Sequence, residues 1–396
     1  MEDISFLKRA EQIKEDLIKW RRNFHMNPEL DYDLCNTTKY IEEFLEKNGI
    51  EYEKVARAGL CAIIRGKGSK TVALRADMDA LPLEDRKEVI YASKNLGKMH
   101  ACGHDAHTAI LMGAALILNE LKDKLQGNVK LFFEPAEETT GGASLMIREG
   151  VMENPYVDGV IGLHVDEKIP CGKIGVKKGV VNAASDSFKV KIIGKGGHGA
   201  HPDTTVDPIF IASSVIVNLQ SIVSRELPPT SPGVVTVGCI QGGTANNIIP
   251  EEVHFKGTIR TMKTEHRHYV RSRFKEIVEG MVKSLRGECI IEIEESYPCL
   301  YNNDDMVKSF LKSAEEVMDK KDILDLDEPS MGVESFAYFS MERPGIFYNL
   351  GVRNESKGII HPAHGSLFDI DEESLALGAA LQSKFACDFL KIIDKE

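Results

Sequence analysis

Hydrophobic and polar positions follow one pattern along the first part of this chain and a different one further on. Up to residue 184, short runs rich in β-branched and aliphatic residues alternate with stretches of helical periodicity. The predicted strands are 61–64, 71–74, 129–133 and 160–164, and the predicted helices among them are 104–122 and 141–150. Strands alternating with helices predict an α/β fold, in which helices cover the faces of a mostly parallel sheet.

Between residues 185 and 296 the order of the predicted elements changes. A strand (188–193), a helix (208–225), two strands (234–240 and 252–260), a helix (265–285) and a strand (288–294) follow one another. The order β-α-β-β-α-β is that of a ferredoxin-like unit. Beyond residue 297 the mixed helix and strand pattern resumes. We therefore expect a domain formed by residues 1–184 and 297–396, into which residues 185–296 are inserted as a second domain.

The N-terminal segment predicts a surface helix. Phe6, Ala10, Ile13 and Leu17 form one apolar face, and charges elsewhere in the segment are not typical of a signal peptide. The longest apolar stretch, 109–118, is far shorter than the ~20 residues that a membrane span needs. We expect a cytoplasmic protein with no membrane partner.

The composition gives further evidence on the cellular compartment and on the binding partners. The eight cysteines have no paired spacing, which is typical of reduced and mostly buried thiols. The chain has 396 residues, more than one hydrophobic core usually serves. It carries 61 acidic against 49 basic residues, a balance that argues against nucleic acid or an anionic membrane surface as a partner.

One short segment gathers metal-binding side chains at the start of the predicted 104–122 helix. His100, Cys102, His104, Asp105 and His107 fall within eight positions, next to a glycine that allows a tight turn. A helix N-terminus would lower the pKa of the Cys102 thiol. On these residues alone the segment is either a metal site or a reactive-thiol site, in which Cys102 is the nucleophile and His104 or His107 the base.

Paired carboxylates follow two of the predicted strands, at the edge of a parallel sheet where ligands gather. Asp77 and Asp79 lie two residues apart, so both could ligate a metal or orient a ligating histidine. Glu137 and Glu138 point in different directions, so that one could bind a metal while the other removes a proton from water. The structural alternatives are an acidic turn and a solvated acidic loop.

Histidines elsewhere in the chain add further candidates. His164 ends a predicted strand and is either a ligand or a hydrogen-bonded structural residue. His361 and His364 precede the last helix and are either ligands or part of a polar loop that leads into it. His198 lies among four glycines in 194–199 of the inserted region. Such an open backbone suits a histidine delivered to a site elsewhere, although a plain glycine-rich turn is the alternative.

The segments that carry these residues occur in the order found in a known family. They read RADMDALP, MHACGHDAH, EPAEE, GLHV, GKGGHGAHPD, GGTANNIIP, GTIRT, MGVESF and HGSLFDIDEE, and span nearly the whole chain. Together they resemble the metal-dependent amidohydrolases that include aminoacylases, hippurate hydrolases, auxin-conjugate hydrolases and N-acetyl-diaminopimelate deacetylases.

The resemblance implies a site for two divalent metal ions, for which Zn²⁺, Mn²⁺, Co²⁺ and Ni²⁺ are the candidates. Cys102 would bridge the two ions. His104 and His164 would complete the coordination of one ion, and Glu138 and His364 that of the other. His364 is favoured over His361 because the family's ligand lies four residues before the first residue of a Phe-x-x-Asp-Glu stretch, which here begins at residue 368.

The resemblance also implies roles for residues that do not bind metal. Glu137 would be the general base, and His198 would resemble the lid histidine that reaches the partner subunit's site and stabilises the oxyanion. Asn247 and Arg260 would contact the substrate carboxylate. We therefore expect a homodimer formed through the inserted lid domain. The chain departs from the family at Ser335, where Asp is common.

The expected activity is hydrolysis of N-acyl-amino acids to a carboxylate and a free amino acid. A metallo-dipeptidase or a carboxypeptidase on the same scaffold is the nearby alternative. Two further classes remain open: a hydrolase with Cys102 as a thiol nucleophile, and a binding protein that keeps the fold without catalysis.

Overall fold

The computed structural model describes residues 5–392, and the chain forms two compact units. Unit 1 comprises the residues up to Val181 together with Tyr301–Glu328 and those from Glu334 onward. Unit 2 comprises Asn182–Leu300 and Pro329–Val333. The short segment Pro329–Val333 belongs to unit 2 because the carbonyl oxygens of Ser330 and Gly332 accept hydrogen bonds from the backbone N–H of Ala183. Residues 1–4 and 393–396, which belong to the predicted first domain, lie outside the described residues.

Unit 1 contains most of the helices and the larger sheet. Its helices are α1 (Phe6–Gln12), α2 (Lys14–Met26), α3 (Cys35–Lys47), α4 (His104–Glu120), α5 (Gly142–Arg148), α8 (Asp304–Glu315), α9 (Phe336–Glu342) and α10 (Ser374–Ile392). The strands of its large sheet are β1 (Glu51–Val55), β2 (Gly59–Ile64), β3 (Thr71–Asp77), β4 (Asn128–Glu134), β5 (Gly159–Pro170), β6 (Ile174–Val176), β15 (Ile323–Asp325) and β16 (Gly345–Arg353). Two short strands, β7 (Gly179–Asn182) and β14 (Leu300–Asn302), form a separate two-stranded sheet.

The large sheet has the strand order β1-β2-β4-β3-β5-β16-β6-β15. Its four central strands, β4, β3, β5 and β16, are parallel to one another, whereas β2 and β6 join this centre in antiparallel fashion. The predicted α/β fold with a mainly parallel sheet is therefore confirmed. Every residue of β3 and β4 is buried, as expected for central strands covered on both faces. Because Asp77 pairs with Glu134, both strands end at the same edge.

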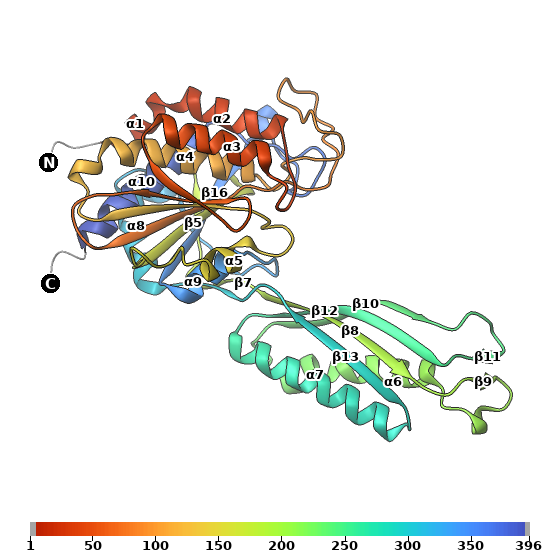
Figure 1. Cartoon of the computed structure of the whole chain (residues 1–396). Helices are drawn as coiled ribbons and strands as arrows, with labels where there is room; N and C mark the ends of the chain where they lie inside the picture. The colour runs from red at the N-terminus through yellow and green to blue at the C-terminus, as the bar shows by residue number, and fades with distance from the viewer. Residues whose placement is uncertain (1–4, 393–396) are drawn as a thin grey trace. The chain divides into compact units, whose positions relative to one another are not determined.

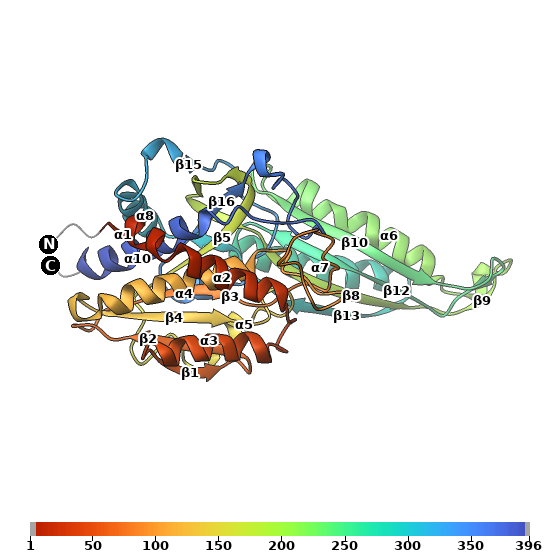
Figure 2. The ribbon, with the colours of Figure 1, turned by 90° about the horizontal axis from the view of Figure 1, so that it is seen from above.

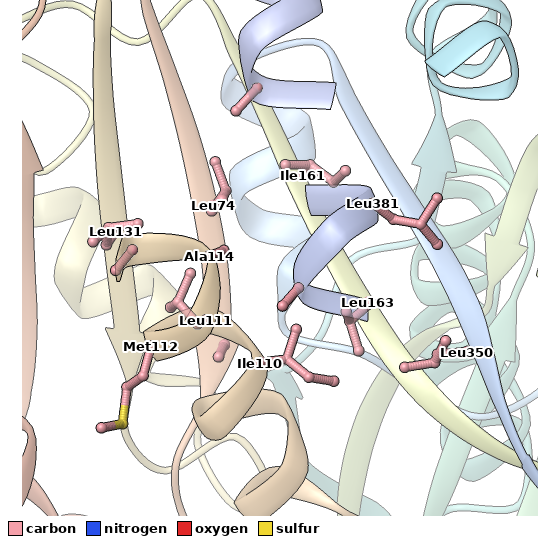
Figure 3. Packing of buried hydrophobic residues seen from close by; sticks show 14 of the residues in the cluster. Leu74, Ile110, Leu111, Met112, Ala114, Leu131, Ile161, Leu163, Leu350 and Leu381 are labelled. Atoms are coloured by element: carbon pink, nitrogen blue, oxygen red, sulfur yellow. The ribbon is translucent and has the colours of Figure 1, made fainter. Parts of the chain in front are cut away.

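The main core of unit 1 lies between the sheet and helices α4 and α10. Leu74, Leu131, Ile161 and Leu350 point from the central strands toward Ile110 of α4 and its neighbours (Figure 3). Helices α1 and α2 pack against α10 and α4, and α5 and α9 lie on the opposite side of the sheet (Figures 1 and 2). The fourteen buried residues of α4 explain its long apolar run.

The N-terminal segment differs from the predicted single helix in two ways. It forms α1 and α2, separated at Ile13, and its apolar positions Ala10, Ile13 and Leu17 are buried as predicted. Further along α2, however, Arg21 and His25 are also fully buried. The apolar periodicity gave no indication of these two polar residues.

The prediction that the cysteines are mostly buried is wrong. All eight are free thiols, but only Cys61 and Cys387 are buried; Cys35 is exposed and the others are half-buried. Several lie on amphipathic strands at the unit surface, where a small side chain is tolerated on either face.

Unit 2 is built on a four-stranded antiparallel sheet with the order β10-β12-β8-β13. Its elements in chain order are β8 (Ala184–Ile193), β9 (Gly197–His198), α6 (Pro208–Ser221), β10 (Gly233–Gly242), β11 (Ile248–Ile249), β12 (Glu252–Thr261), α7 (Thr264–Ser284) and β13 (Glu288–Glu295). Helices α6 and α7 cover one face of the sheet, and Phe188, Phe255 and Phe274 lie in the core between them. The short strands β9 and β11 pair at one end of the unit (Figure 1).

The helix predicted at 208–225 is apolar enough to qualify as a candidate membrane span, which was not predicted from the sequence. Within the described residues, the helical stretch Pro208–Glu226 is 19 residues long with a mean hydropathy of 1.3, which satisfies the length and composition of a membrane span. Only 33% of its most apolar window is buried. Length and composition alone are weak evidence for a membrane span, and an apolar surface of this kind also suits contact with another protein.

Candidate metal centre

The segment before α4 turns so that Cys102 and His104 face the same side. Gly103 has a φ of 89° and is the residue from which α4 starts. A side chain there would meet Val165 Cγ2 at 2.3 Å, so only glycine fits. His104 Nδ1 donates a hydrogen bond to the Asp79 carbonyl oxygen at 2.8 Å. This bond leaves His104 Nε2 free to accept a ligand.

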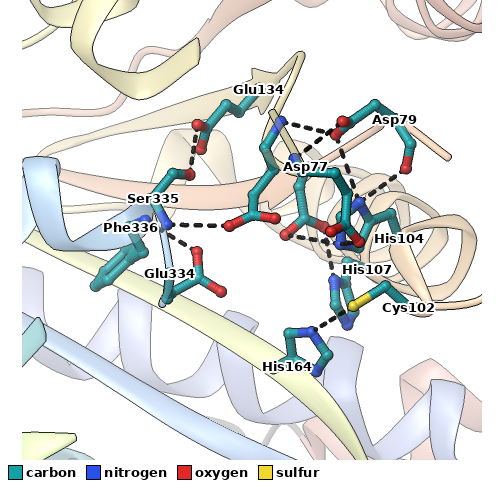
Figure 4. A network of polar contacts seen from close by, with 12 residues as sticks. Asp77, Asp79, Cys102, His104, His107, Glu134, His164, Glu334, Ser335 and Phe336 are labelled. Carbon is teal, nitrogen blue, oxygen red and sulfur yellow. Dashed lines mark hydrogen bonds and ion pairs between the residues drawn. The ribbon is translucent and has the colours of Figure 1, made fainter. Parts of the chain in front are cut away.

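The turn after β4 places Glu137 and Glu138 beside this segment. Ala136 has a φ of 56°, in the left-handed region that few residues other than glycine adopt. The Asp79 carboxylate accepts hydrogen bonds from the backbone N–H groups of Glu137 and Glu138, at 2.9 and 3.1 Å. Asp79 therefore fixes both the turn and, through its own carbonyl oxygen, the orientation of His104 (Figure 4).

Two more histidines approach the Cys102 sulfur from other parts of unit 1. His164 Nε2 lies 3.3 Å from Cys102 Sγ, and His364 Nε2 lies 3.4 Å from it. His164 comes from the middle of β5, so the prediction that it ends a strand is wrong: the strand continues to Pro170 because β16 pairs with it along this length. His364 has a φ of 62°, a strained conformation, and its backbone N–H donates to Ala101.

These side chains form two groups that share one thiol. Cys102, His104 and His164 form one group, and Cys102, Glu138 and His364 the other; the ligand atoms in each lie within 4.8 Å of one another. His104 Nε2 and Glu138 Oε1 are buried without a hydrogen-bond partner. Unpaired buried polar atoms are costly, so both atoms fit a site that receives a cation. A thiolate, three imidazoles and a carboxylate suit Zn²⁺ and related transition metals.

The protonation of the cluster agrees with a cation site. Burial opposes the Cys102 thiolate, but His164 and hydrogen bonds from the surrounding histidines lower the pKa of Cys102 well below its usual value. Burial would lower the pKa of His164, yet the Cys102 charge raises it to about 10. Burial and the same thiolate raise the pKa of Glu138 to about 8. The metal-free cluster therefore binds protons that a metal would displace.

His107 and Asp77 lie beside the cluster and, together with His104, form a further group of possible ligands. His107 Nδ1 donates to Asp77 Oδ1 at 2.6 Å, and His107 Nε2 accepts from the backbone N–H of Val165 at 2.9 Å. Because burial lowers the pKa of His107 to about 4, this imidazole is neutral near pH 7. Both of its ring nitrogens are occupied by these bonds.

A second set of residues holds the Glu137 carboxylate, and Figure 4 labels three of them, Glu134, Glu334 and Ser335. The backbone N–H of Ser335 donates to Glu137 Oε1 at 3.1 Å. The Ser335 hydroxyl donates to Glu134 at 2.5 Å and accepts from Arg75 at 2.7 Å. Arg75 also binds Asp77 and Glu134, at 2.8 and 2.6 Å, so one buried guanidinium joins three parts of the site.

Sequence reasoning missed Arg75, Glu134 and Glu334 as supporting residues. The sign that could have revealed Arg75 and Glu134 is a charged residue inside a strand that is otherwise apolar on both faces. Glu334 pairs with Arg75 at 3.1 Å. Burial and the Glu334 charge raise the pKa of Glu137 well above its usual value.

The predicted site residues of unit 2 lie in two separate places. His198 pairs with Ile248 where β9 meets β11, and the Asn247 carbonyl oxygen accepts from the backbone N–H of Gly199 at 2.8 Å. Arg260 lies near the other end of β12, where it donates to Ser185. His198 and Asn247 thus neighbour each other, and Arg260 is separate from both. His361, the alternative ligand, is only half-buried and forms none of the metal-binding groups found among the described residues.

Unit 1 combines a mainly parallel α/β sheet with a cluster of possible metal ligands. Residues 73–388 match the model of peptidase family M20/M25/M40, and the chain belongs to this family. The resemblance noted in the sequence is thereby confirmed, and so is the expectation of an enzyme that hydrolyses amide bonds.

Three curated relatives show the range of activities near this chain. Thermostable carboxypeptidase 2 of Saccharolobus solfataricus is 40% identical, over 96% of this chain and 97% of its own length. IAA-amino acid hydrolase ILR1-like 4 of Arabidopsis thaliana is 38% identical, over 95% and 87%. N-acetyl-L-cysteine deacetylase of Bacillus subtilis is 40% identical, over 92% and 85%.

A solved structure bears on the metal centre. A Bacillus subtilis protein described as a dinuclear metal binding peptidase from the M20 family superposes with a TM-score of 0.82 and 32% identity, covering 96% of this chain and 99% of its own. This similarity supports two divalent metals for a member of the family with this fold.

Proposed function

We propose that the chain is a dinuclear-metal amidohydrolase that cleaves N-acyl-amino acids to a carboxylate and a free amino acid. The observation that carries the proposal is the pair of ligand groups that share Cys102. His104 and His164 would bind one ion, Glu138 and His364 the other, and the Cys102 thiolate both. When bound, the two ions would acidify a water molecule and polarise the amide carbonyl.

Glu137 is the general base in this proposal. Its carboxylate accepts a hydrogen bond from the Ser335 backbone N–H, which orients it. The raised pKa of Glu137 suits a group that takes a proton from water and returns it to the departing amine. The return of that proton matters because an unprotonated amine is a poor leaving group.

Unit 2 serves as the lid and dimerisation domain. His198 would stabilise the oxyanion, and Asn247 and Arg260 would contact the substrate carboxylate. His198 and Arg260 lie at opposite ends of the sheet, separated by the eight-residue length of β12 from Glu252 to Arg260, which is about 27 Å at ~3.4 Å per residue. That separation is much longer than an N-acyl-amino acid.

One chain therefore cannot place both side chains on one substrate molecule without large rearrangement of its own sheet. We infer a homodimer in which His198 acts in the site of the other copy. The exposed apolar residues of α6 and of the neighbouring edge strand β10 support contact between copies. They are Ile209, Phe210, Val217, Val234 and Ile240. An exposed edge strand beside an apolar helix is a surface that two-fold pairing would cover.

A second candidate function is cleavage of peptides from the carboxyl end, favoured by the 40% identical relative that is named a carboxypeptidase. Both activities need the same metal site and differ in the group attached to the amino acid's nitrogen. We place the enzyme in the cytoplasm, which the eight free thiols support.

The test is a panel of N-acetyl-, N-benzoyl- and indole-acyl-amino acids beside unblocked dipeptides, assayed with metal-loaded protein. The proposal predicts a higher kcat/KM for the N-acyl compounds. Turnover of the dipeptides alone would replace the proposal with the second candidate.

A further inference from the structure

Helix α2 carries two fully buried polar side chains one helical turn apart, Arg21 and His25. Neither belongs to a metal-binding group, and the chemistry described above does not use them. Burying a guanidinium is costly unless it is paired on every side, so a buried arginine requires a specific set of partners.

Arg21 has partners in two distant parts of the chain. Its Nε donates to Asp105 Oδ2 at 2.8 Å, and its Nη2 donates to Asp369 Oδ1, also at 2.8 Å. A third bond, at 3.2 Å, reaches Glu372. His25 Nδ1 donates to the same Asp105 oxygen at 2.6 Å. The Asp105 carboxylate thus accepts hydrogen bonds from two residues of one helix.

Two of these carboxylates lie on segments that carry proposed metal ligands. Asp105 follows His104 directly in the first turn of α4. Asp369 follows His364 by five residues. Phe368, directly before Asp369, is buried, and its ring lies 3.7 Å from the position that a Cβ on Gly103 would take. Arg21 therefore joins the segment that carries Cys102 and His104 to the segment that carries His364.

Residues outside α2 also form hydrogen bonds with the 366–369 segment. Lys87 Nζ donates to the Phe368 carbonyl oxygen at 2.8 Å, and the Tyr91 hydroxyl donates to Asp369 Oδ2 at 2.7 Å. Lys87 Nζ also lies 2.9 Å from His25 Nε2. Arg21 and His25 are consequently central members of one continuous buried network.

We propose that Arg21 and His25 are positioning residues that set the distance between His104 and His364 around Cys102, and so determine how tightly the two metals are held. The inference rests on the ligand assignment made above. Removing a residue that orients a metal ligand typically lowers the metal affinity about 10–100-fold. A purely structural role would instead change the stability of unit 1 and leave metal retention as it is.

The chain supplies a matched control in the next residue. Arg22 binds Glu372 through Nε and Nη2, at 2.9 and 2.6 Å, and shares that carboxylate with Arg21. Arg22→Lys therefore tests the Glu372 contact while the side chains of Arg21, Asp105 and Asp369 stay unchanged. Arg22 is about one-third exposed, at 34%. A second control is Arg267 of unit 2, which is buried against Asp186 and lies in the other unit.

The experiment uses the full-length protein loaded with Co²⁺, whose bond to a thiolate absorbs in the near ultraviolet. Loss of this absorption after a chelator is added reports metal release. Trp20, the chain's one tryptophan, lies beside Arg21, so its fluorescence during urea unfolding of the metal-free protein reports the stability of unit 1 separately. The variants are Arg21→Lys, His25→Leu and His25→Asn, with Arg22→Lys and Arg267→Lys as controls.

We expect Arg21→Lys and His25→Leu to release cobalt about 10–100-fold faster than the parent protein. His25→Asn, which keeps a donor near the Nδ1 position, should stay within a few-fold of the parent, as should both controls. Arg21→Lys should accelerate release of both ions, and His25→Leu mainly release of the ion held by His104.

Unchanged cobalt release in Arg21→Lys and His25→Leu, with lower urea midpoints, would overturn the inference and leave a structural role. If Arg21→Lys does not fold, His25→Leu against His25→Asn still decides the outcome. A parent protein that shows no thiolate–cobalt absorption would contradict the ligand assignment itself, which is a different failure.

Discussion

The candidate residues of the two units are organised in opposite ways. In unit 1 the candidate ligand atoms of each metal-binding group lie within 4.8 Å of one another, and buried carboxylates and a buried arginine bond the segments that carry them. In unit 2 His198 and Asn247 are exposed, and Arg260 lies at the other end of the sheet. The difference agrees with the proposal that unit 1 contains the metal and proton-transfer site, whereas the unit 2 residues would act only together with substrate and a second copy.

The largest effect should come from emptying the metal site in unit 1. Chelation of both ions should reduce hydrolysis of an N-acyl-amino acid to the background rate, and adding Zn²⁺, Mn²⁺ or Co²⁺ back should restore it. The measurement is initial rate against bound metal. Full activity after complete metal removal, together with loss on thiol alkylation, would instead assign Cys102 as a nucleophile.

Glu137→Gln should lower kcat about 10²–10⁴-fold, because it removes a general base while keeping the shape of the side chain. Metal content should stay at the parent value, since Glu137 belongs to neither ligand group that contains Cys102. Glu134→Gln is a matched control that alters a neighbouring buried carboxylate bonded to Arg75. Turnover of Glu137→Gln within a few-fold of the parent would exclude it as the base.

His198→Ala should lower kcat about 10²–10³-fold, as expected when an oxyanion donor is lost. Its role in the other copy can be measured by mixing it with Cys102→Ala, which has no intact metal site. If each site uses one residue from each chain, random exchange makes half the dimers mixed, and about a quarter of the parent activity returns. His201→Ala, three residues away in the same segment, is the control.

No recovery of activity in the mixture, with subunit exchange verified, would show that His198 acts within its own chain. That result would remove the strongest functional argument for the homodimer. The exposed apolar residues of α6 would then have no proposed binding partner.

Arg260→Gln should raise KM about 10–100-fold with a smaller change in kcat, because it loses a charged hydrogen bond to the substrate carboxylate. Lys256→Gln, four residues earlier on β12, should leave both constants near the parent values. A fall in kcat with unchanged KM would mean that Arg260 does not bind the ground-state substrate.

The smallest effect concerns the pH dependence of unit 1. Burial lowers the pKa of His100 from 6.5 to about 3, so the folded state binds fewer protons than the unfolded state between these values. The free energy of unfolding should therefore be fully retained above pH 6.5 and fall below it, by up to about 1.4 kcal/mol per pH unit. His100→Asn should lose less stability between pH 7 and pH 5 in the metal-free protein, followed by Trp20 fluorescence. Equal losses would contradict this assignment.

Much of the fold, and the candidacy of the Cys102–His104 segment as a metal site, could be predicted because the information is local. The strands β3 and β4 are short apolar runs, and Cys102 and His104 adjoin the glycine that starts α4. The assignment of Glu138, His164 and His364 as ligands came from the family resemblance and stays a prediction. The supporting bonds could not be predicted in this way. Arg21 meets Asp105 across 84 residues and Asp369 across 348, and Ser335 holds Glu137 through a backbone N–H that carries no sequence signature.

The bridging role of Cys102 is the central claim, and a cobalt titration of the metal-free protein tests it most directly. Each added Co²⁺ should bind the same thiolate, so the near-ultraviolet thiolate–cobalt absorption should increase up to two equivalents per chain and be absent in Cys102→Ser. Saturation of that absorption at one equivalent, while a second ion still binds, would show that the thiolate holds a single metal and contradict the account.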